Sequence, residues 1–183
     1  MNDMLIVPAR AEMSARTGFA ANLFDRAAEL RDDEPTRAAL LAAPEARFAV
    51  VAGDRPVLRR DGACFGVWHD AAALASLGEA RHVVFLGREH GQGRFGVRID
   101  ADRVDALRER ADLLTLDLRS LAIQGLVPPA ELGAIGEAKA MTDWHARHMF
   151  CANCGATTGA ASGGWKRECA ACGAQHFPRT DPV

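Results

Sequence analysis

Four cysteines near the C-terminus are the residues of this chain whose types and spacing most clearly support chemistry. Cys151 and Cys154 form one Cys-x-x-Cys pair, and Cys169 and Cys172 form a second pair after fourteen intervening residues. Each pair can direct two thiolates at one point, and the segment between them is long enough to bring the pairs together. Four thiolates suit tetrahedral Zn²⁺ and leave no open position for water. The spacing therefore predicts a structural zinc site.

Two histidines and a fifth cysteine leave alternatives open. His148 lies three residues before Cys151 and His176 four residues after Cys172, so either could replace a thiol in a Cys₃His site. Because four cysteines already have suitable spacing, we expect both histidines to flank the metal. Iron is the other metal that such knuckles accommodate. Cys64 has apolar neighbours and no His/acid pattern around it, so we expect a buried core thiol and not a nucleophile.

Composition restricts the class of protein. The chain has 183 residues, 49% hydrophobic and 25% charged, which suffices for one ordinary domain plus a small module. A net charge of −2 argues against a protein that mainly coats nucleic acid. The N-terminus lacks the order of a signal peptide, and no apolar run approaches the roughly 18 residues of a membrane span. We therefore expect a cytoplasmic protein without membrane association, whose paired cysteines bind metal and do not form disulfides.

The hydrophobic pattern predicts the elements that position the cysteines. Apolar residues at helical spacing predict helices over residues 19–30, 36–43, 70–77 and 101–110, the last of them capped by Asp100. Short β-prone runs between Gly and Asp turns predict strands over residues 48–51, 56–60, 63–68, 82–86, 94–99 and 113–116. Together these elements predict an α+β fold rich in antiparallel pairing over residues 1–125.

A connecting helix and a small ribbon are predicted to follow this domain. Pro128-Pro129 opens a helix within residues 126–150, with Ile135, Ala138, Met141 and Met149 along one stripe. Residues 151–183 then form a Cys₄ zinc ribbon with two strands, near residues 165–169 and 175–178, and a loop of small residues over 155–164. Lys166 and Arg167 can offset the formal −2 charge of a tetrathiolate zinc.

Phe177 and a glycine-rich segment are further candidates for function. Phe177 precedes Pro178, and its ring either packs inside the ribbon or offers a stacking surface for a base. The segment Gly91–Gly96 matches G-x-G-x-x-G, but a dinucleotide fingerprint needs its third glycine at the start of a helix. Residues 95–99 alternate like a strand instead, so we expect a hairpin loop over residues 88–93. No P-loop, nucleophile elbow or zinc-protease helix occurs in the sequence.

Several segments resemble bacterial NADH pyrophosphatases, which are Nudix hydrolases. The zinc-ribbon segments that carry the resemblance are Asp143–Gly155 (DWHARHMFCANCG), Gly163–Gly173 (GGWKRECAACG) and His176–Val183 (HFPRTDPV). Upstream, Thr17-Gly18-Phe19, Asp25-Arg26-Ala27, Val84–Gly87 and Asp117–Leu121 are similar to the family's N-terminal domain. The resemblance implies a degenerate Nudix-like domain, then a zinc ribbon, then a catalytic Nudix domain.

The resemblance also implies a function. Such enzymes hydrolyse NAD(H) to nicotinamide mononucleotide and AMP with Mg²⁺ or Mn²⁺ held by glutamates of the Nudix box, and some remove NAD caps from RNA. The family typically forms homodimers. In the family, the aromatic residue that matches Phe177 lies beside the base of the dinucleotide, so the resemblance implies that Phe177 binds substrate.

The sequence departs from the family pattern at the catalytic motif. No Gly-x₅-Glu-x₇-Arg-Glu-x-x-Glu-Glu pattern occurs, and Arg108-Glu109-Arg110 is the nearest fragment. The chain stops at Val183, where the first strand of the family's catalytic domain is expected to begin. We therefore expect the front portion of such an enzyme, without catalytic residues of its own. The alternative is a free-standing zinc-ribbon module that binds nucleic acid or a protein partner.

Overall fold

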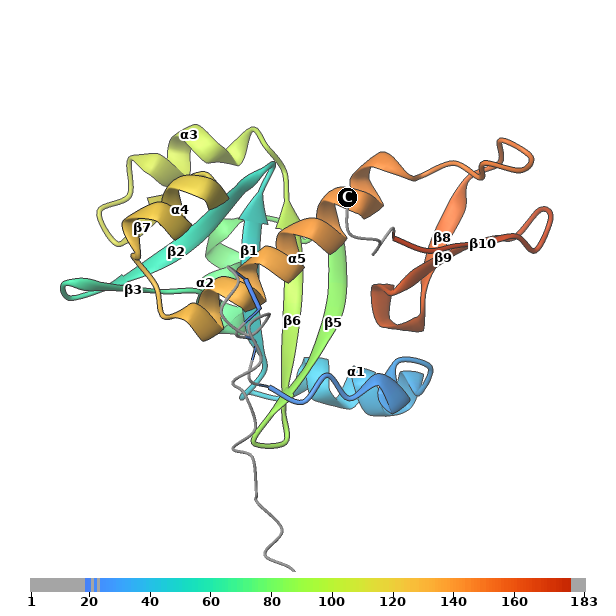
Figure 1. The fold of residues 1–183 in the computed structure, drawn as a ribbon, viewed down its shortest axis with the longest axis horizontal. Helices are drawn as coiled ribbons and strands as arrows, with labels where there is room; N and C mark the ends of the chain where they lie inside the picture. Colours follow the sequence, from blue (N-terminus) through green and yellow to red (C-terminus); the bar gives the residue numbers. More distant parts are fainter. Residues whose placement is uncertain (1–18, 21, 23, 179–183) are drawn as a thin grey trace, which may run out of the picture.

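A computed structural model describes residues 19–178 except residues 21 and 23, and it shows an α+β domain joined to a small ribbon (Figure 1). The larger sheet has the order β3-β2-β1-β6-β5, with β4 beside β1 and β7 beside β2. Its strands are β1 (Arg47–Ala52), β2 (Arg55–Asp61), β3 (Cys64–Gly66), β4 (Trp68–His69), β5 (His82–Glu89), β6 (Gln92–Ile99) and β7 (Leu113–Thr115). The predicted fold class is confirmed.

Helices cover both faces of this sheet, and three short strands form the ribbon. The helices are η2 (Ala28–Leu30), α1 (Glu34–Ala42), α2 (Ala71–Leu77), α3 (Arg103–Arg108), α4 (Leu118–Gln124) and α5 (Pro129–Arg147). The ribbon comprises β8 (Thr158–Ala161), the 3₁₀ turn η3 (Ser162–Gly164), β9 (Lys166–Cys169) and β10 (Gln175–His176), in the sheet order β10-β9-β8. Among the described helices, none is both long enough and apolar enough to cross a membrane.

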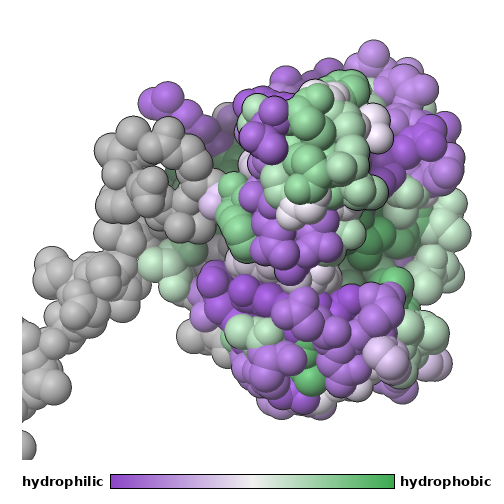
Figure 2. Space-filling view, turned by 90° about the vertical axis from the view of Figure 1, so that its right-hand side faces the viewer, coloured by the Kyte–Doolittle hydropathy of each residue, from purple (hydrophilic) through white to green (hydrophobic). Residues whose placement is uncertain are grey.

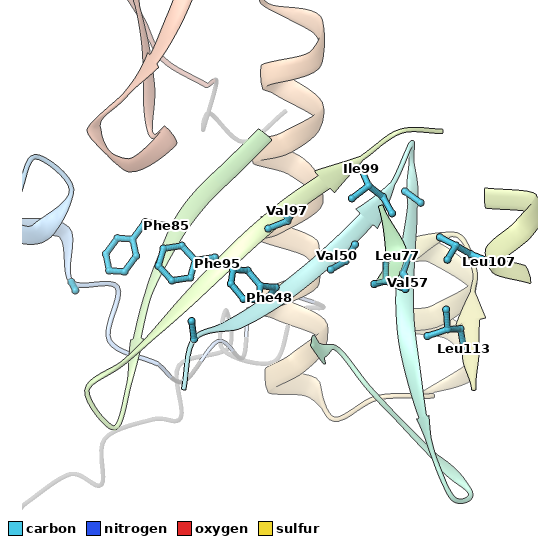
Figure 3. Close-up of a cluster of buried hydrophobic side chains, with 13 residues drawn as sticks. Phe48, Val50, Val57, Leu77, Phe85, Phe95, Val97, Ile99, Leu107 and Leu113 are labelled. Carbon is cyan, nitrogen blue, oxygen red and sulfur yellow. The ribbon is translucent and has the colours of Figure 1, made fainter. Parts of the chain in front are cut away.

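The alternation of side chains along the strands divides the domain into two cores. On one face, Phe48 of β1 packs with Phe85 and Phe95, and this core continues to side chains of α2 and α3 (Figure 3). On the other face, residues of α5 pack onto the sheet, among them the predicted stripe residues Ile135, Ala138 and Met141. Pairing is antiparallel throughout the sheet except between β1 and β6 at its centre, which run parallel.

Close packing fixes α5 against the sheet and thereby positions the ribbon that follows it. A Cβ added to Gly96 of β6 would lie 2.8 Å from the Cβ of Ala138, so the absence of a side chain lets the helix approach the strand. α5 ends at Arg147, so Met149 lies beyond the helix and is exposed, contrary to the predicted stripe. Ten residues, 148–157, separate α5 from β8, and the first cysteine pair lies in this interval.

The glycine-rich segment lies in a hairpin, as predicted. β5 and β6 pair from His82↔Arg98 to Glu89↔Gln92, so the turn is His90-Gly91 alone. Both turn residues have positive φ, 50° and 79°, which matches the twist of a two-residue hairpin turn. The strands therefore extend further towards the turn than the predicted loop over residues 88–93.

The helix predicted over residues 19–30 is wrong for its described part. Only the 3₁₀ turn η2 forms, because the preceding backbone pairs with β5: the Arg88 N–H donates to the Asp25 carbonyl at 2.6 Å. This contact requires Gly87, since a Cβ there would lie 2.2 Å from the Asp25 carbonyl oxygen. Thr17 and Gly18 of the family-like motif lie outside the described residues.

Two further predictions were wrong, and one helix was missed, for local reasons. The cap position of α3 is Asp102, because Asp100 accepts hydrogen bonds from Arg81 (2.7 Å for Nη2). α4 was not predicted, although the Asp117 carboxylate accepts the Ser120 N–H at 2.9 Å, an ordinary N-terminal capping pattern. Cys64 is exposed and not buried, because it pairs with Asp61 beside the turn of the β2–β3 hairpin.

Candidate metal centre

The first cysteine pair lies in a tight turn directly after α5. The Cys151 N–H donates to the Ala156 carbonyl at 2.7 Å, and the Gly155 N–H donates to the Cys151 carbonyl at 2.9 Å. Gly155 has a φ of 78°, a conformation that favours glycine. These bonds close the backbone around the sulfur of Cys151 and direct Cys154 toward the same side.

The second pair repeats this geometry. The Cys169 N–H donates to the Ala174 carbonyl at 3.0 Å, and the Gly173 N–H donates to the Cys169 carbonyl at 2.9 Å. Gly173 has a φ of 73°, close to that of the glycine in the first turn. β8 and β9 connect the two turns, so the small-residue segment over 155–164 contains a strand and a 3₁₀ turn where a loop was expected. The ribbon therefore has three strands and not two.

The structure brings the four predicted cysteines together. All four Sγ atoms lie within 4.8 Å of one another, with Cys151 to Cys172 at 3.6 Å and Cys154 to Cys169 at 3.5 Å. Zinc–sulfur bonds of about 2.3 Å in a tetrahedron give sulfur–sulfur distances of about 3.8 Å. All five cysteines of the chain are free of disulfides. The number, type and spacing of these donors therefore fit a structural zinc ion.

The pKa values of these thiols show that the cluster requires a cation. The backbone N–H of Ala174, with help from the Asn153 amide, lowers the pKa of the Cys172 thiol to about 6. At Cys154 the backbone N–H of Ala156 favours the thiolate, yet the neighbouring sulfurs together raise its pKa to about 12. Four adjacent thiolates repel one another, so a cation at their centre is needed for all of them to ionise together.

Two side chains donate hydrogen bonds to the sulfurs and were not singled out for this role by the sequence. His176 Nε2 lies 3.3 Å from Cys151 Sγ, and Asn153 Nδ2 lies 3.6 Å from Cys172 Sγ. His148, the other flanking histidine, has its Nδ1 directed at the Trp144 carbonyl at 2.9 Å. Spacing alone treated the two histidines alike, whereas the fold places His176 beside the cluster.

The two basic residues before Cys169 differ in their roles. Lys166 Nζ pairs with Glu168 at 2.8 Å. Arg167 is buried, and it donates through Nε to Thr158 Oγ1 at 2.7 Å and through Nη1 to His145 Nδ1 at 2.9 Å. Arg167 therefore also links the ribbon to α5, in addition to any compensation of thiolate charge.

His145 completes the contact between ribbon and domain. Its Nε2 donates to the Gly164 carbonyl at 2.7 Å, and its ring stacks on His82 of β5 with 5.6 Å between centroids. Burial, opposed in part by the bond to Gly164, lowers the pKa of His145 to about 4, so the imidazole is neutral at pH 7 and can accept the Arg167 N–H. Nearby, the Trp165 indole N–H donates to the Phe85 carbonyl at 2.7 Å. No sequence pattern predicts this network, because its members are far apart in the chain.

Phe177 lies on the surface of the ribbon. Its side chain is 61% exposed, which leaves the ring available for contact and places it outside the ribbon interior. The family-like residues 179–183 after it lie outside the described part of the chain.

Comparison with known proteins assigns these two units to one family. The family model for the NADH pyrophosphatase-like rudimentary NUDIX domain matches residues 36–144. A second model, for the NADH pyrophosphatase zinc ribbon domain, matches residues 146–177. The chain belongs to the NADH pyrophosphatase-like Nudix family. The matched ribbon contains all four clustered cysteines, His176 and Phe177.

Two curated relatives match part of this Nudix-family chain. The NAD-capped RNA hydrolase NudC of Stutzerimonas stutzeri is 38% identical over 56 residues, which are 31% of this chain and 20% of the relative. Nudix hydrolase 19, chloroplastic, of Arabidopsis thaliana is 36% identical over 55 residues, which are 29% of this chain and 13% of the relative. The matched region is thus a fifth or less of either relative.

Proposed function

We propose that this chain is the N-terminal and zinc-ribbon portion of an NAD(H) diphosphatase. The observation that carries the proposal is the match of two family models to consecutive ranges, residues 36–144 and 146–177. The proposed reaction is hydrolysis of the NAD(H) pyrophosphate to nicotinamide mononucleotide and AMP. The NudC relative extends the proposed substrates to NAD-capped RNA. The proposed organisation is a Nudix-like domain over residues 1–125, a connecting helix over 126–150 and the zinc ribbon over 151–183, in a homodimeric protein.

The proposed metal is one structural Zn²⁺ bound by Cys151, Cys154, Cys169 and Cys172. Convergence of their sulfurs within 4.8 Å supports this set of ligands. When bound, zinc would compensate the thiolate charge and hold the two cysteine turns together. Four protein ligands leave no position for a water molecule, so the proposed role of this metal is structural and not catalytic.

Hydrolysis of the pyrophosphate is proposed to require groups beyond these 183 residues. The reaction uses divalent cations beside the phosphates, and the family holds Mg²⁺ or Mn²⁺ with Nudix-box glutamates. The sequence has no such pattern. We therefore expect this chain alone to be inactive and a catalytic Nudix domain to supply the cations and the chemistry.

Phe177 is the proposed substrate contact on this chain. Its exposed ring stands at the end of β10, and Pro178 restricts the backbone that presents it. A flat apolar ring gains about 1–3 kcal/mol by stacking on a base, with little dependence on base identity. Phe177 would therefore contribute to binding of the dinucleotide and not to bond cleavage.

The first test is hydrolysis by the purified chain and by the chain joined to the catalytic domain of the NudC relative. With NADH and Mn²⁺, we expect no mononucleotide from the chain alone and metal-dependent product from the fusion, resolved by chromatography. Mononucleotide release by the chain alone would show that it carries catalytic groups of its own. A fusion that is folded and metal-loaded but inactive, together with saturable binding of RNA or a protein by the chain, would favour the alternative of a binding module.

The second test uses the active fusion and two matched exposed aromatics. Phe177→Ala should raise the KM for NADH about tenfold without changing zinc content or Tm. Phe150→Ala removes a ring that is similarly exposed, at 63%, from the position directly before the ribbon and should leave KM unchanged. An equal effect of both substitutions on KM, or a fall in Tm for Phe177→Ala alone, contradicts the proposed contact.

A further inference from the structure

A cavity of about 450 Å³ separates the ribbon from α1. Its walls come from three parts of the chain that are distant in sequence: the α1 region, the strands β5 and β6, and the segment from β8 to η3. Figure 2 shows this face of the molecule, with the ribbon above and the α1 region below. Sites for small molecules commonly have volumes of about 300–1,000 Å³ and lie between structural units. This cavity is separate from the cysteine cluster and has no role in the proposed hydrolysis.

One side of the cavity is apolar and accessible. Leu41 of α1 and Val83 of β5 line it, and they are 40% and 39% exposed although both are large hydrophobic residues. On the ribbon side the lining consists of small residues, including Ala160 and Ala161 of β8. Small side chains there leave space between the two apolar walls. A flat organic group could fill this space and remove both walls from water.

The polar side of the cavity carries a guanidinium group held in a fixed position. Arg31 lines the cavity, and its Cζ lies 3.5 Å from the centroid of the Trp165 ring. Stacking of this kind orients the guanidinium plane and leaves its N–H groups directed outward at the edge. Arg31 Nε is buried and has no hydrogen-bond partner among the described residues. A buried donor without a partner is costly, and an acceptor bound in the cavity would remove that cost.

Carboxylates near Arg31 are already engaged by other groups. Glu34 pairs with Arg37, and the Asp32 carboxylate accepts the Ser162 hydroxyl at 2.5 Å.

Glu137 is likewise occupied at both of its oxygens. Oε1 pairs with Arg26 at 2.8 Å, and Oε2 accepts from the Asn22 amide at 2.9 Å. Arg31 therefore has no ion pair among the described residues, whereas its neighbours Arg26 and Arg37 do. Burial, and next the charge of Arg26, lower the pKa of Arg31, while the charge of Glu137 opposes this shift without forming an ion pair. An anion placed directly at the guanidinium would therefore be favourable.

We propose that this cavity binds a mononucleotide, with its phosphate at Arg31 and its base between the ribbon and the apolar wall of Leu41 and Val83. A guanidinium binds a phosphate through charge-assisted hydrogen bonds, and an apolar slot accepts a flat base. The choice of a mononucleotide among small organic anions rests on the proposed function, whose products are mononucleotides. The site itself rests on the cavity and on the unpaired Arg31.

The test is a titration of the zinc-loaded chain with AMP, in which two-dimensional NMR spectra report binding. We expect saturable shifts at Val83, residues 160–164 and the Trp165 indole. Adenosine, which lacks the anion, and inorganic phosphate, which lacks the base, should each bind at least about tenfold more weakly than AMP. Because no turnover is measured, failure of binding would overturn this site without bearing on the proposed hydrolysis.

Two variants on α1 distinguish AMP binding in the cavity from nonspecific effects of a substitution. Ala38→Phe places a ring in the cavity from an exposed lining position of α1 and should abolish AMP binding, whereas Ala39→Phe at the next exposed position should leave it unchanged. Arg31→Gln should weaken AMP about tenfold and leave adenosine unaffected. Retained zinc and an unchanged far-ultraviolet spectrum check the folding of each variant. The proposal is overturned if AMP fails to saturate, if its shifts map elsewhere, or if Ala38→Phe and Ala39→Phe behave alike.

Discussion

The sheet domain and the ribbon achieve their structure by different means. The sheet domain has hydrophobic cores on both faces of its sheet. The described part of the ribbon, residues 151–178, has two buried hydrophobic residues, Cys151 and Cys169. Thr158 and Arg167, both polar, are also buried there. The ribbon thus places sulfur and hydrogen-bonding groups where the domain places aliphatic and aromatic side chains.

The difference follows from size. A segment of about 30 residues cannot remove enough apolar surface from water to offset its loss of conformational entropy. A metal ion supplies that free energy locally, and binding then becomes part of folding. The same chain therefore contains one unit expected to fold without metal and one expected to depend on it.

The largest predicted effect is removal of the metal. Apparent binding free energies of structural zinc are about 10–16 kcal/mol at neutral pH, so chelation should unfold the ribbon from about residue 150 onward. The sheet domain should stay folded, because its cores do not include the metal. Amide hydrogen exchange before and after chelation measures both regions in one sample. Elemental analysis should give one zinc per chain and no iron.

Single ligand substitutions sharpen this prediction. Cys151→Ser or Cys172→Ser should abolish stoichiometric zinc, whereas Cys64→Ser, at an exposed position away from the cluster, should not. A Cys172→Ser protein that retains one zinc per chain would contradict the assignment of ligands.

A core substitution should destabilise the sheet domain and leave zinc binding unchanged, which is the reverse of a ligand substitution. Ile135→Ala deletes a fully buried side chain of α5 and should lower the free energy of unfolding of the sheet domain by about 2–5 kcal/mol. Zinc content should be unchanged. Ile123→Ala, at a position 74% exposed, is the matched control and should change stability by less than about 0.5 kcal/mol. Denaturant unfolding with separate probes for domain and ribbon makes the comparison, and equal effects of the two substitutions would refute it.

A smaller effect is predicted at the outer side of the cysteine cluster. His176 donates to Cys151 Sγ, and loss of such a contact typically lowers metal affinity about 10- to 100-fold. His176→Ala should therefore transfer zinc to a chelator faster, and His176→Gln should recover part of the difference by keeping an N–H donor. His148→Ala, whose side chain bonds to the Trp144 carbonyl, should behave like the unmodified protein. Equal zinc transfer by His176→Ala and His148→Ala would exclude the proposed contribution.

The smallest predicted effect is a pH dependence of the contact between the two units. Burial keeps the pKa of His145 near 4 in the folded protein, below its ordinary value of 6.5, so folding favours the neutral ring. Its contribution to stability is complete above pH 6.5 and is lost progressively as the pH falls towards 4. The cationic ring would face Arg167 and could no longer accept its N–H, and His82 lies on the other side.

Melting temperatures measured between pH 7.5 and 4.5 test this dependence. His145→Gln should flatten the curve relative to the unmodified protein, while His90→Gln, at an exposed turn, should leave its shape unchanged. A curve for His145→Gln that parallels that of the unmodified protein would show that other groups account for the dependence.

The sequence predicted the elements that depend on local pattern. α1, the strands β1, β2, β5 and β6, and the hairpin at Gly91 followed from hydrophobic periodicity and turn residues. The helix expected over residues 19–30 failed because the backbone at Asp25 instead pairs with β5, a contact across more than 60 residues. Local propensity does not encode such pairing, and the need for Gly87 became clear only when the two segments were seen together.

The candidate site shows the same division between features set by local sequence and features set by long-range contacts. The convergence of the four cysteines was predictable because each pair is local and the segment between the pairs is short. The contact of His176 with Cys151 depends on the antiparallel register of β10 with β9, and the link from His145 to Arg167 depends on the docking of the ribbon against α5. Sequence spacing ranked His148 and His176 equally because it carries no information about register.

The position of the ribbon has a consequence for solubility during metal loss. β5 lies at one end of the sheet, and an unpaired strand edge is a template on which another chain can add a strand. The Trp165 indole N–H donates a hydrogen bond to the Phe85 carbonyl of this strand. A Cβ on Gly164 would lie 3.1 Å from the Val84 Cα. The ribbon therefore packs closely against part of that edge. A ribbon that unfolds without zinc withdraws this cover. Loss of zinc would therefore expose this part of the β5 edge to pairing with another chain.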